Sequence, residues 1–72
     1  MSSTEKSLLI KLGAAIRRER MALGITQDRL AELSKLHLRS LQKIEAGEIN
    51  VLITTVQRIQ SALDIPWGAL MK

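Results

Sequence analysis

Apolar residues recur every three or four positions along most of this chain, with breaks at Gly24, Gly47 and the segment 64–66. This spacing is typical of a helix with one buried face. Gly commonly follows the last turn of a helix, and Pro66 disfavours helical geometry in the residue before it. The pattern therefore predicts five helices and no strand: from Glu5 or Ser7 to 23, then 27–34, 38–46, about 52–63 and 67–71. Met1 to about Ser3 reads as a free tail.

Each of the first four predicted helices has a face expected to point into a common core. Thr26 stands where an N-cap is expected, directly before the helix over 27–34. The inward positions, in chain order, are Leu9, Leu12, Ile16, Arg20 and Leu23; Leu30, Ala31 and Ser34; Ser40, Leu41 and Ile44; and Ile53, Val56, Ile59 and Leu63.

Composition supports one small all-α domain spanning residues 1–72. The chain has 72 residues, which is near the lower limit for a domain that is stabilised by its hydrophobic core without disulfides or metal ions. The high hydrophobic content, 46% of residues, compensates for this short length. There is no Cys and only one His, so disulfides and thiolate or His-based metal sites are not expected, and no cofactor is predicted. The longest apolar run is too short for a membrane span, and the N-terminus lacks a secretory pattern. A cytoplasmic protein is expected.

The segment 24–47 carries the main functional signal. It reads as two short helices joined by a tight turn. The solvent-facing side of the second helix is formed by Leu38, Arg39, Gln42 and Lys43. A short helix with long polar side chains, held at a fixed angle by a partner helix, suits the major groove of double-stranded DNA. The net charge of +4 also suits a polyanion. These features predict a DNA-binding regulator.

A family resemblance strengthens this prediction. The chain is similar, over about residues 9–70, to the helix-turn-helix domain of phage Cro proteins and repressors, the Xre type. The resemblance implies a lambda repressor-like five-helix bundle with its helix-turn-helix core at about 26–46. It also implies a small repressor that binds a palindromic operator as a homodimer, in a bacterial or phage setting and associated with the nucleoid. It rests on Gly24-Ile25-Thr26-Gln27, Leu30-Ala31, Leu36, Leu41, Ile44-Glu45-x-Gly47 and Ile65-x-Trp67.

The resemblance also assigns roles to individual residues. Leu38, Arg39, Gln42 and Lys43 would face the bases, and Gln27 would contact a phosphate and brace the helix over 38–46. Arg20 and Glu45 match a buried ion pair. Three departures stand out, and one of them is Leu38, which replaces a commonly polar first reading position. Lys35 replaces the usual turn Gly, so it must adopt a left-handed conformation. The loop 48–52 lacks the basic residues of many relatives, which leaves Asn50 and backbone N–H groups as its possible phosphate contacts.

Several residues keep two interpretations. Leu38 either packs on a thymine methyl or packs back on the helix over 27–34. His37 either contacts a phosphate or simply closes the turn as the cap residue. Arg17 and Arg18 either approach the DNA backbone or are solvated.

The C-terminal residues Ile65, Trp67, Leu70 and Met71 form the predicted dimer contact. Trp67 is expected partly in the core, with Leu70 and Met71 nearer the partner. Gln57 and Gln60 are candidates for hydrogen bonds across that interface. The alternative function is an antitoxin or another protein-interaction module that uses this fold to hold a partner such as a toxin. No nucleophile–base pair or carboxylate pair has plausible catalytic spacing, so an enzyme is not expected.

Overall fold

The computed structural model describes residues 3–71, which form five helices and no strand. Their bounds are α1 Ser3–Leu23, α2 Gln27–Ser34, α3 Leu38–Glu45, α4 Ile53–Leu63 and α5 Trp67–Leu70. The predicted all-α, five-helix architecture is confirmed, although α1 begins earlier than expected. The predicted tail lies outside the described residues except for Ser3, which opens α1. No helix within residues 3–71 is long and apolar enough to cross a membrane.

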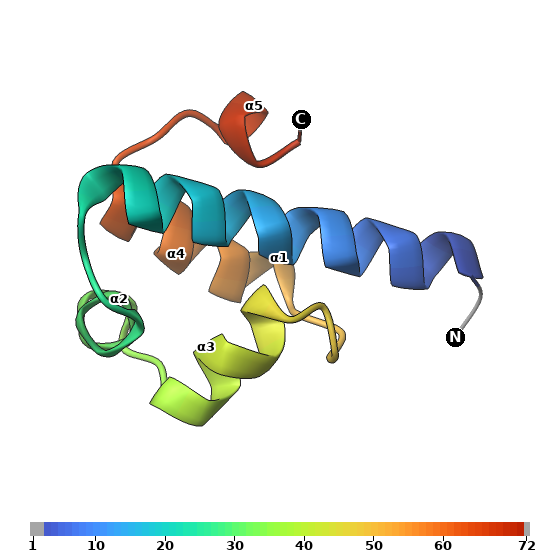
Figure 1. Cartoon of the computed structure of the whole chain (residues 1–72), viewed down its shortest axis with the longest axis horizontal. Helices are drawn as coiled ribbons and strands as arrows, with labels where there is room; N and C mark the ends of the chain where they lie inside the picture. The colour runs from blue at the N-terminus through green and yellow to red at the C-terminus, as the bar shows by residue number, and fades with distance from the viewer. Residues whose placement is uncertain (1–2, 72) are drawn as a thin grey trace.

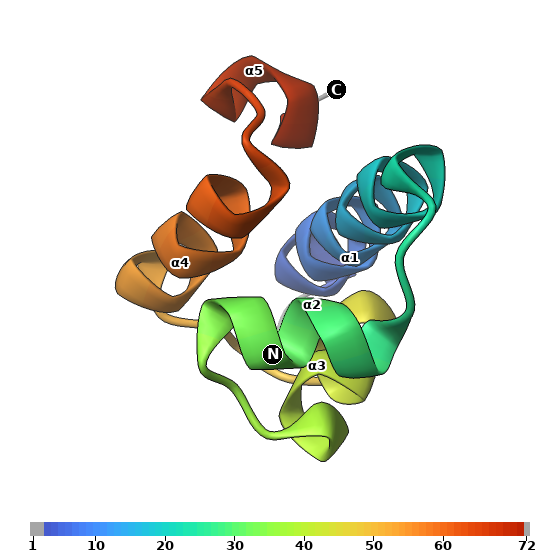
Figure 2. The same cartoon turned by 90° about the vertical axis from the view of Figure 1, so that its left-hand side faces the viewer.

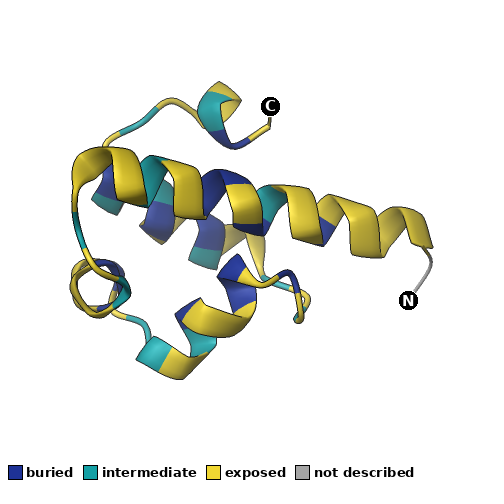
Figure 3. Ribbon diagram, in the orientation of Figure 1, coloured by how far each residue is buried: buried dark blue, intermediate teal, exposed yellow. Residues whose placement is uncertain are grey.

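The long helix α1 is the axis on which the other elements are arranged. Figure 1 shows α3 on one side of α1 and α5 on the other, and Figure 2 shows α4 beside α1 with α2 closing the lower side. The N-terminal half of α1 extends past the other helices (Figure 1), and residues 3–8 are all exposed. The core lies where the helices meet (Figure 3), and its most deeply buried large side chains are Ile16, Leu30, Leu41, Ile59 and Leu70.

The predicted inward faces are correct in the middle of the helices and wrong at two helix ends. Leu23, the last residue of α1, is 53% exposed, and Ile53, the first residue of α4, is 68% exposed. Periodicity gives the direction in which a side chain points, but it does not show where the neighbouring helix stops. Leu23 and Ile53 therefore remain exposed at the ends of their helices.

The turns have the predicted chemistry. The Thr26 hydroxyl accepts a hydrogen bond from the Arg29 amide at 3.1 Å, so Thr26 caps α2 as expected. Gly24 and Gly47 both have positive φ, at 76° and 71°. Lys35 also adopts the left-handed conformation, with φ 57° and ψ 44°, and its amide bonds to carbonyls of the last turn of α2. A helix can therefore end at a non-glycine residue here, at a cost of roughly 1–2 kcal/mol.

Gly13 permits the closest approach between α1 and α3. A Cβ atom built on Gly13 would lie 2.3 Å from the carbonyl oxygen of Ile44 and 2.6 Å from that of Glu45. Both atoms belong to the backbone, so a side-chain rotation cannot relieve the contact. The absence of a side chain at this position of α1 therefore allows the short distance between α1 and α3.

We expect Lys35→Gly to stabilise the protein. Glycine removes the left-handed strain, and the greater freedom of the unfolded chain offsets part of the gain, which leaves about 0.5 kcal/mol. Urea unfolding, followed by circular dichroism, measures the change. Lys35→Ala is the matched control, because it removes the long side chain but keeps the Cβ atom that causes the strain. Equal stabilisation by both variants would show that the side chain, and not the backbone conformation, is unfavourable.

Candidate nucleic-acid interface

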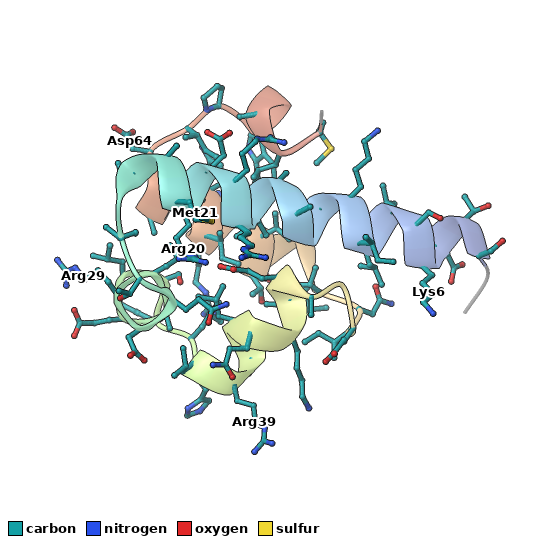
Figure 4. All side chains as sticks on the ribbon, in the orientation of Figure 1. Lys6, Arg20, Met21, Arg29, Arg39 and Asp64 are labelled. Carbon is teal, nitrogen blue, oxygen red and sulfur yellow. The ribbon has the colours of Figure 1, made fainter. Side chains whose placement is uncertain are left out.

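The two faces of α3 differ sharply in burial. Leu41, Ile44 and Glu45 are buried against the domain. Arg39, Gln42 and Lys43 are exposed, and Figure 4 shows Arg39 pointing away from the body of the molecule. These three side chains make no hydrogen bond to any other of the described residues. We call Arg39, Gln42 and Lys43 the reading face. The structure places them as predicted, but their contacts with bases remain a prediction.

A buried hydrogen-bond network fixes α3 to the helices behind it. The Arg20 guanidinium donates to both oxygens of Glu45, with Nε 2.8 Å from Oε2 and Nη2 3.1 Å from Oε1. Its third nitrogen, Nη1, donates to the carbonyl oxygen of Ile25 at 2.9 Å. The side chains of Arg20 and Glu45 are only 11% and 3% exposed. The predicted buried ion pair is therefore present, and it joins α1 and the loop after it to α3.

Gln27 completes this network from α2. Its Nε2 donates to Oε1 of Glu45 at 3.1 Å, so the predicted bracing of α3 by Gln27 is present. The carboxylate of Glu45 thus accepts bonds from two other helices. Because the Gln27 amide already has a structural partner, substitution of Gln27 would alter both α3 and any phosphate contact.

Arg17 lies beside this network rather than alone on the surface. A shallow polar depression is lined by Arg17, Arg20, Gln27, Gln42, Glu45 and Ala46. It opens next to the N-terminus of α2, where free backbone N–H groups and the helix dipole favour an anion. Arg17 supplies an exposed positive charge there. The depression brings together two predicted phosphate contacts, Arg17 and Gln27, with one residue of the reading face.

Three other predicted contacts have different surroundings. Leu38, the first residue of α3, is half-buried, which fits either of its two interpretations. His37 is exposed at the N-cap of α3 but makes no side-chain cap hydrogen bond, so its imidazole does not close the turn. Asn50 is exposed in the loop after α3 and lines a groove between α1, α4 and the end of the chain.

The predicted C-terminal dimer contact is partly wrong. Leu70 is 1% exposed and belongs to the core, so it offers no surface to a partner. Met71 is 58% exposed, in line with the expectation, but Trp67 is 38% exposed and thus more exposed than Leu70, contrary to the expectation. The short helix α5 is closed onto α1 by Arg18, whose Nη2 donates to the carbonyl oxygen of Ala69 at 2.8 Å. Leu70→Asp would place a carboxylate in the core and unfold the protein, so it cannot test dimerisation.

The predicted role of Gln60 is also revised. Its side-chain amide donates to the carbonyl oxygen of Ile65, which ties the end of α4 to the loop before α5. This hydrogen bond lies within one chain, so the Gln60 amide already has a partner without a second molecule. Gln57 is exposed and lines a separate depression between α2 and α4.

Sequence reasoning missed two structural contacts, one that positions α3 and one that positions α5. Gly13 is a single glycine inside a predicted helix, and from the sequence alone such a glycine indicates only a lower helix propensity. Arg18 was considered only as a surface charge, although it fixes α5. In both cases the partner is a backbone carbonyl distant in sequence, and no local pattern marks such a contact.

Comparisons with known proteins agree with this geometry. A helix-turn-helix family model matches residues 16–70. The solved structure of the restriction-modification controller protein C.AhdI from Aeromonas hydrophila is 34% identical. It superposes with a TM-score of 0.86, covering 90% of this chain and 94% of that one. The clp gene regulator ClgR from C. glutamicum is 31% identical, with a TM-score of 0.85 and coverage of 89% and 83%. No curated protein sequence matches. The chain belongs to the Xre-type helix-turn-helix family of DNA-binding regulators.

Proposed function

We propose that this protein is a transcriptional repressor that binds a palindromic operator as a homodimer, with α3 of each copy in the major groove. The observation that supports the proposal most directly is the reading face, whose three long polar side chains are exposed and have no partner among the described residues. They stand on a helix whose rear face is fixed by the Arg20–Glu45 pair. A preorganised helix loses little conformational freedom when it enters a groove.

The expected contacts fall into two kinds. Arg39 is suited to donate two hydrogen bonds to O6 and N7 of a guanine, and Gln42 and Lys43 are suited to neighbouring base edges or phosphates. The depression beside Arg17 and the N-terminus of α2 is suited to a phosphate of the backbone. Most of the affinity should therefore come from phosphate neutralisation and fall steeply with salt, whereas the reading face sets the preferred sequence.

Repression follows from occupancy alone. A dimer bound over a promoter blocks polymerase without any further contact, so the DNA-binding surface is sufficient for this activity. C.AhdI is a controller protein and ClgR is a gene regulator, which supports a role of this protein in the control of transcription. Selection of bound sites from random duplex DNA, followed by a reporter carrying the selected site at its promoter, tests the proposal. Recovery of no preferred sequence, or increased reporter expression, would contradict it.

Arg39→Ala is expected to relax sequence preference at one base pair of each half-site. The loss of a bidentate contact should cost roughly 1–3 kcal/mol on the best site and much less on unrelated DNA. Arg58→Ala is the matched control. Arg58 is an exposed arginine that lines the depression between α2 and α4, so its loss removes the same charge without changing the reading face. Repeating the selection with both variants measures preference, and an unchanged motif for Arg39→Ala would remove Arg39 from the base-reading set.

A further inference from the structure

The side of α1 that faces α3 can be traced residue by residue. Helical spacing of three and four places five residues in one stripe along α1, which we call the α3-facing stripe. Its members are Lys6, Ile10, Gly13, Arg17 and Arg20. Four of them meet α3, its depression or the residues directly after it, whereas Lys6 continues the stripe past the end of α3.

The contacts of the stripe show where α3 lies on it. Arg20 donates to Glu45, the last residue of α3, at 2.8 Å. A Cβ atom on Gly13 would lie 2.6 Å from the carbonyl oxygen of Glu45. A Cβ atom on Gly47, two residues after α3, would lie 2.6 Å from the Cα atom of Ile10. The C-terminal end of α3 therefore meets the middle of the stripe, and the loop after α3 begins beside Ile10.

Lys6 and Arg17 lie on opposite sides of this contact. Arg17 follows Lys6 by three turns of α1, which separates the two backbone positions by about 16 Å along the helix. Arg17 lines the depression next to the N-terminus of α2, whereas Lys6 lies one turn beyond Ile10. Figure 4 shows Lys6 below the overhanging part of α1, on the same side of this helix as α3 and Arg39. Lys6 is exposed and makes no hydrogen bond or ion pair with another of the described residues.

The stability of α1 does not account for a lysine at this position. The residues three and four positions after Lys6 are Leu9 and Ile10, so no acidic side chain in the next turn pairs with it. A positive charge near the N-terminus of a helix is slightly unfavourable because of the helix dipole. The ammonium group of Lys6 is thus available to an anion outside the chain.

A helix in the major groove has a phosphate backbone on each side of it. The groove is about 12 Å wide, so two cations about 16 Å apart, one on each side of the bound helix, suit the two strands that border it. The depression at Arg17 serves one side. The other side contains the C-terminal end of α3 and the loop 48–52, which carries the acidic Glu48. The chain has no Lys or Arg between Lys43 and Arg58, so this side lacks a cation of its own.

We propose that Lys6 binds a backbone phosphate of the DNA strand that runs beside the loop 48–52, across the groove from the strand at Arg17. The inference rests on the proposed operator binding, since insertion of α3 into the major groove determines where the strands lie. A phosphate contact carries no sequence information, so Lys6 contributes affinity and leaves base preference to the reading face. The overhanging part of α1 thereby supplies the contact that its loop does not.

Lys6→Gln tests the contact, and Lys11→Gln is its matched control. Lys11 is also an exposed lysine of α1, but it is about 140° around the helix from Lys6 and lines a groove with Val56 and Leu70. Both variants lose one charge and should stay folded by circular dichroism. We expect Lys6→Gln to lower operator affinity about threefold or more, and to reduce the salt slope by about 0.9 per half-site. Lys11→Gln should keep the parental slope.

Neutral methylphosphonates at single positions of the operator locate the contact. The parent should lose affinity when the phosphate beside the loop 48–52 is replaced, and Lys6→Gln should not respond to that replacement. Both proteins should still respond at the strand next to Arg17. Equal losses in Lys6→Gln and Lys11→Gln, or the same response of the parent and Lys6→Gln at every position, would overturn the inference.

The selected DNA sequence separates this inference from the proposed function. Lys6→Gln should select the same sites as the parent, with lower affinity. If Lys6→Gln bound as tightly as the parent while Arg39→Ala still relaxed base preference, the Lys6 contact would be wrong and operator binding would stand. A parent that selects no preferred sequence would instead contradict the proposed function.

Discussion

Glu45→Ala is expected to lower the free energy of unfolding by about 3–5 kcal/mol. The substitution leaves the Arg20 guanidinium without its carboxylate in a site where the Arg20 side chain is 11% exposed. It also removes the acceptor of the Gln27 amide. A domain of this size has only about 5–15 kcal/mol of stability in total, so the variant should be close to unfolding at 37 °C. Urea denaturation measures the loss.

A double variant shows whether the unpaired charge causes this loss. Replacement of both partners by apolar residues of similar volume, Arg20→Met with Glu45→Leu, should cost less than Glu45→Ala alone, because no charge is left buried. Gln27 still loses its acceptor in the double variant, so some destabilisation should remain. If the double variant were less stable than Glu45→Ala, burial of an unpaired arginine would not be the reason for the effect.

Gly13→Ala is expected to destabilise the protein by about 2 kcal/mol or more, although alanine is the better helix former. The added methyl group would meet the carbonyl oxygens of Ile44 and Glu45 at less than van der Waals distance. Over-packing of this kind typically costs about 1–3 kcal/mol. Because both contacts are backbone atoms of α3, relief requires α3 to move away from α1. Operator affinity should therefore fall even at temperatures where the variant is folded.

Gly68→Ala is the matched control for this prediction. Gly68 lies in α5, and a Cβ atom at that position would have no neighbour within 4 Å. The control should be neutral or slightly stabilised, as expected for alanine in an open helical position. Thermal unfolding and operator titration of both variants distinguish the two cases. A Gly13→Ala protein as stable as the parent would mean that the α1–α3 crossing adjusts without cost.

The limits of α2 and α3 could be predicted from the sequence because local chemistry determines them. Thr26 caps α2 with its own hydroxyl, and Gly47 supplies the left-handed residue after α3. The division of α3 into buried and exposed faces follows from helical periodicity alone. The ion pair of Arg20 with Glu45 was inferred from the family resemblance, since the two residues are 25 positions apart and no local rule pairs them.

The position of Leu70 could not be predicted, and the reason is the length of its helix. Four residues of α5 give too little of a period to tell an inward from an outward side chain. The orientation of α5 depends instead on the distant bond from Arg18 to Ala69. Ile53 illustrates the opposite case. Periodicity predicted an inward position for it, but Ile53 is 68% exposed, because burial depends on where the neighbouring helices end, which is a property of the tertiary structure.

The separation of support and contact in α3 makes this domain suitable for retargeting. The residues that hold the helix, Ile44 and Glu45, face the core, whereas Arg39, Gln42 and Lys43 make no hydrogen bond within the described chain. Their exchange leaves the scaffold untouched. A library varied at these three positions therefore samples new operator sequences at nearly constant stability, and selection can act on base preference without also selecting for folding.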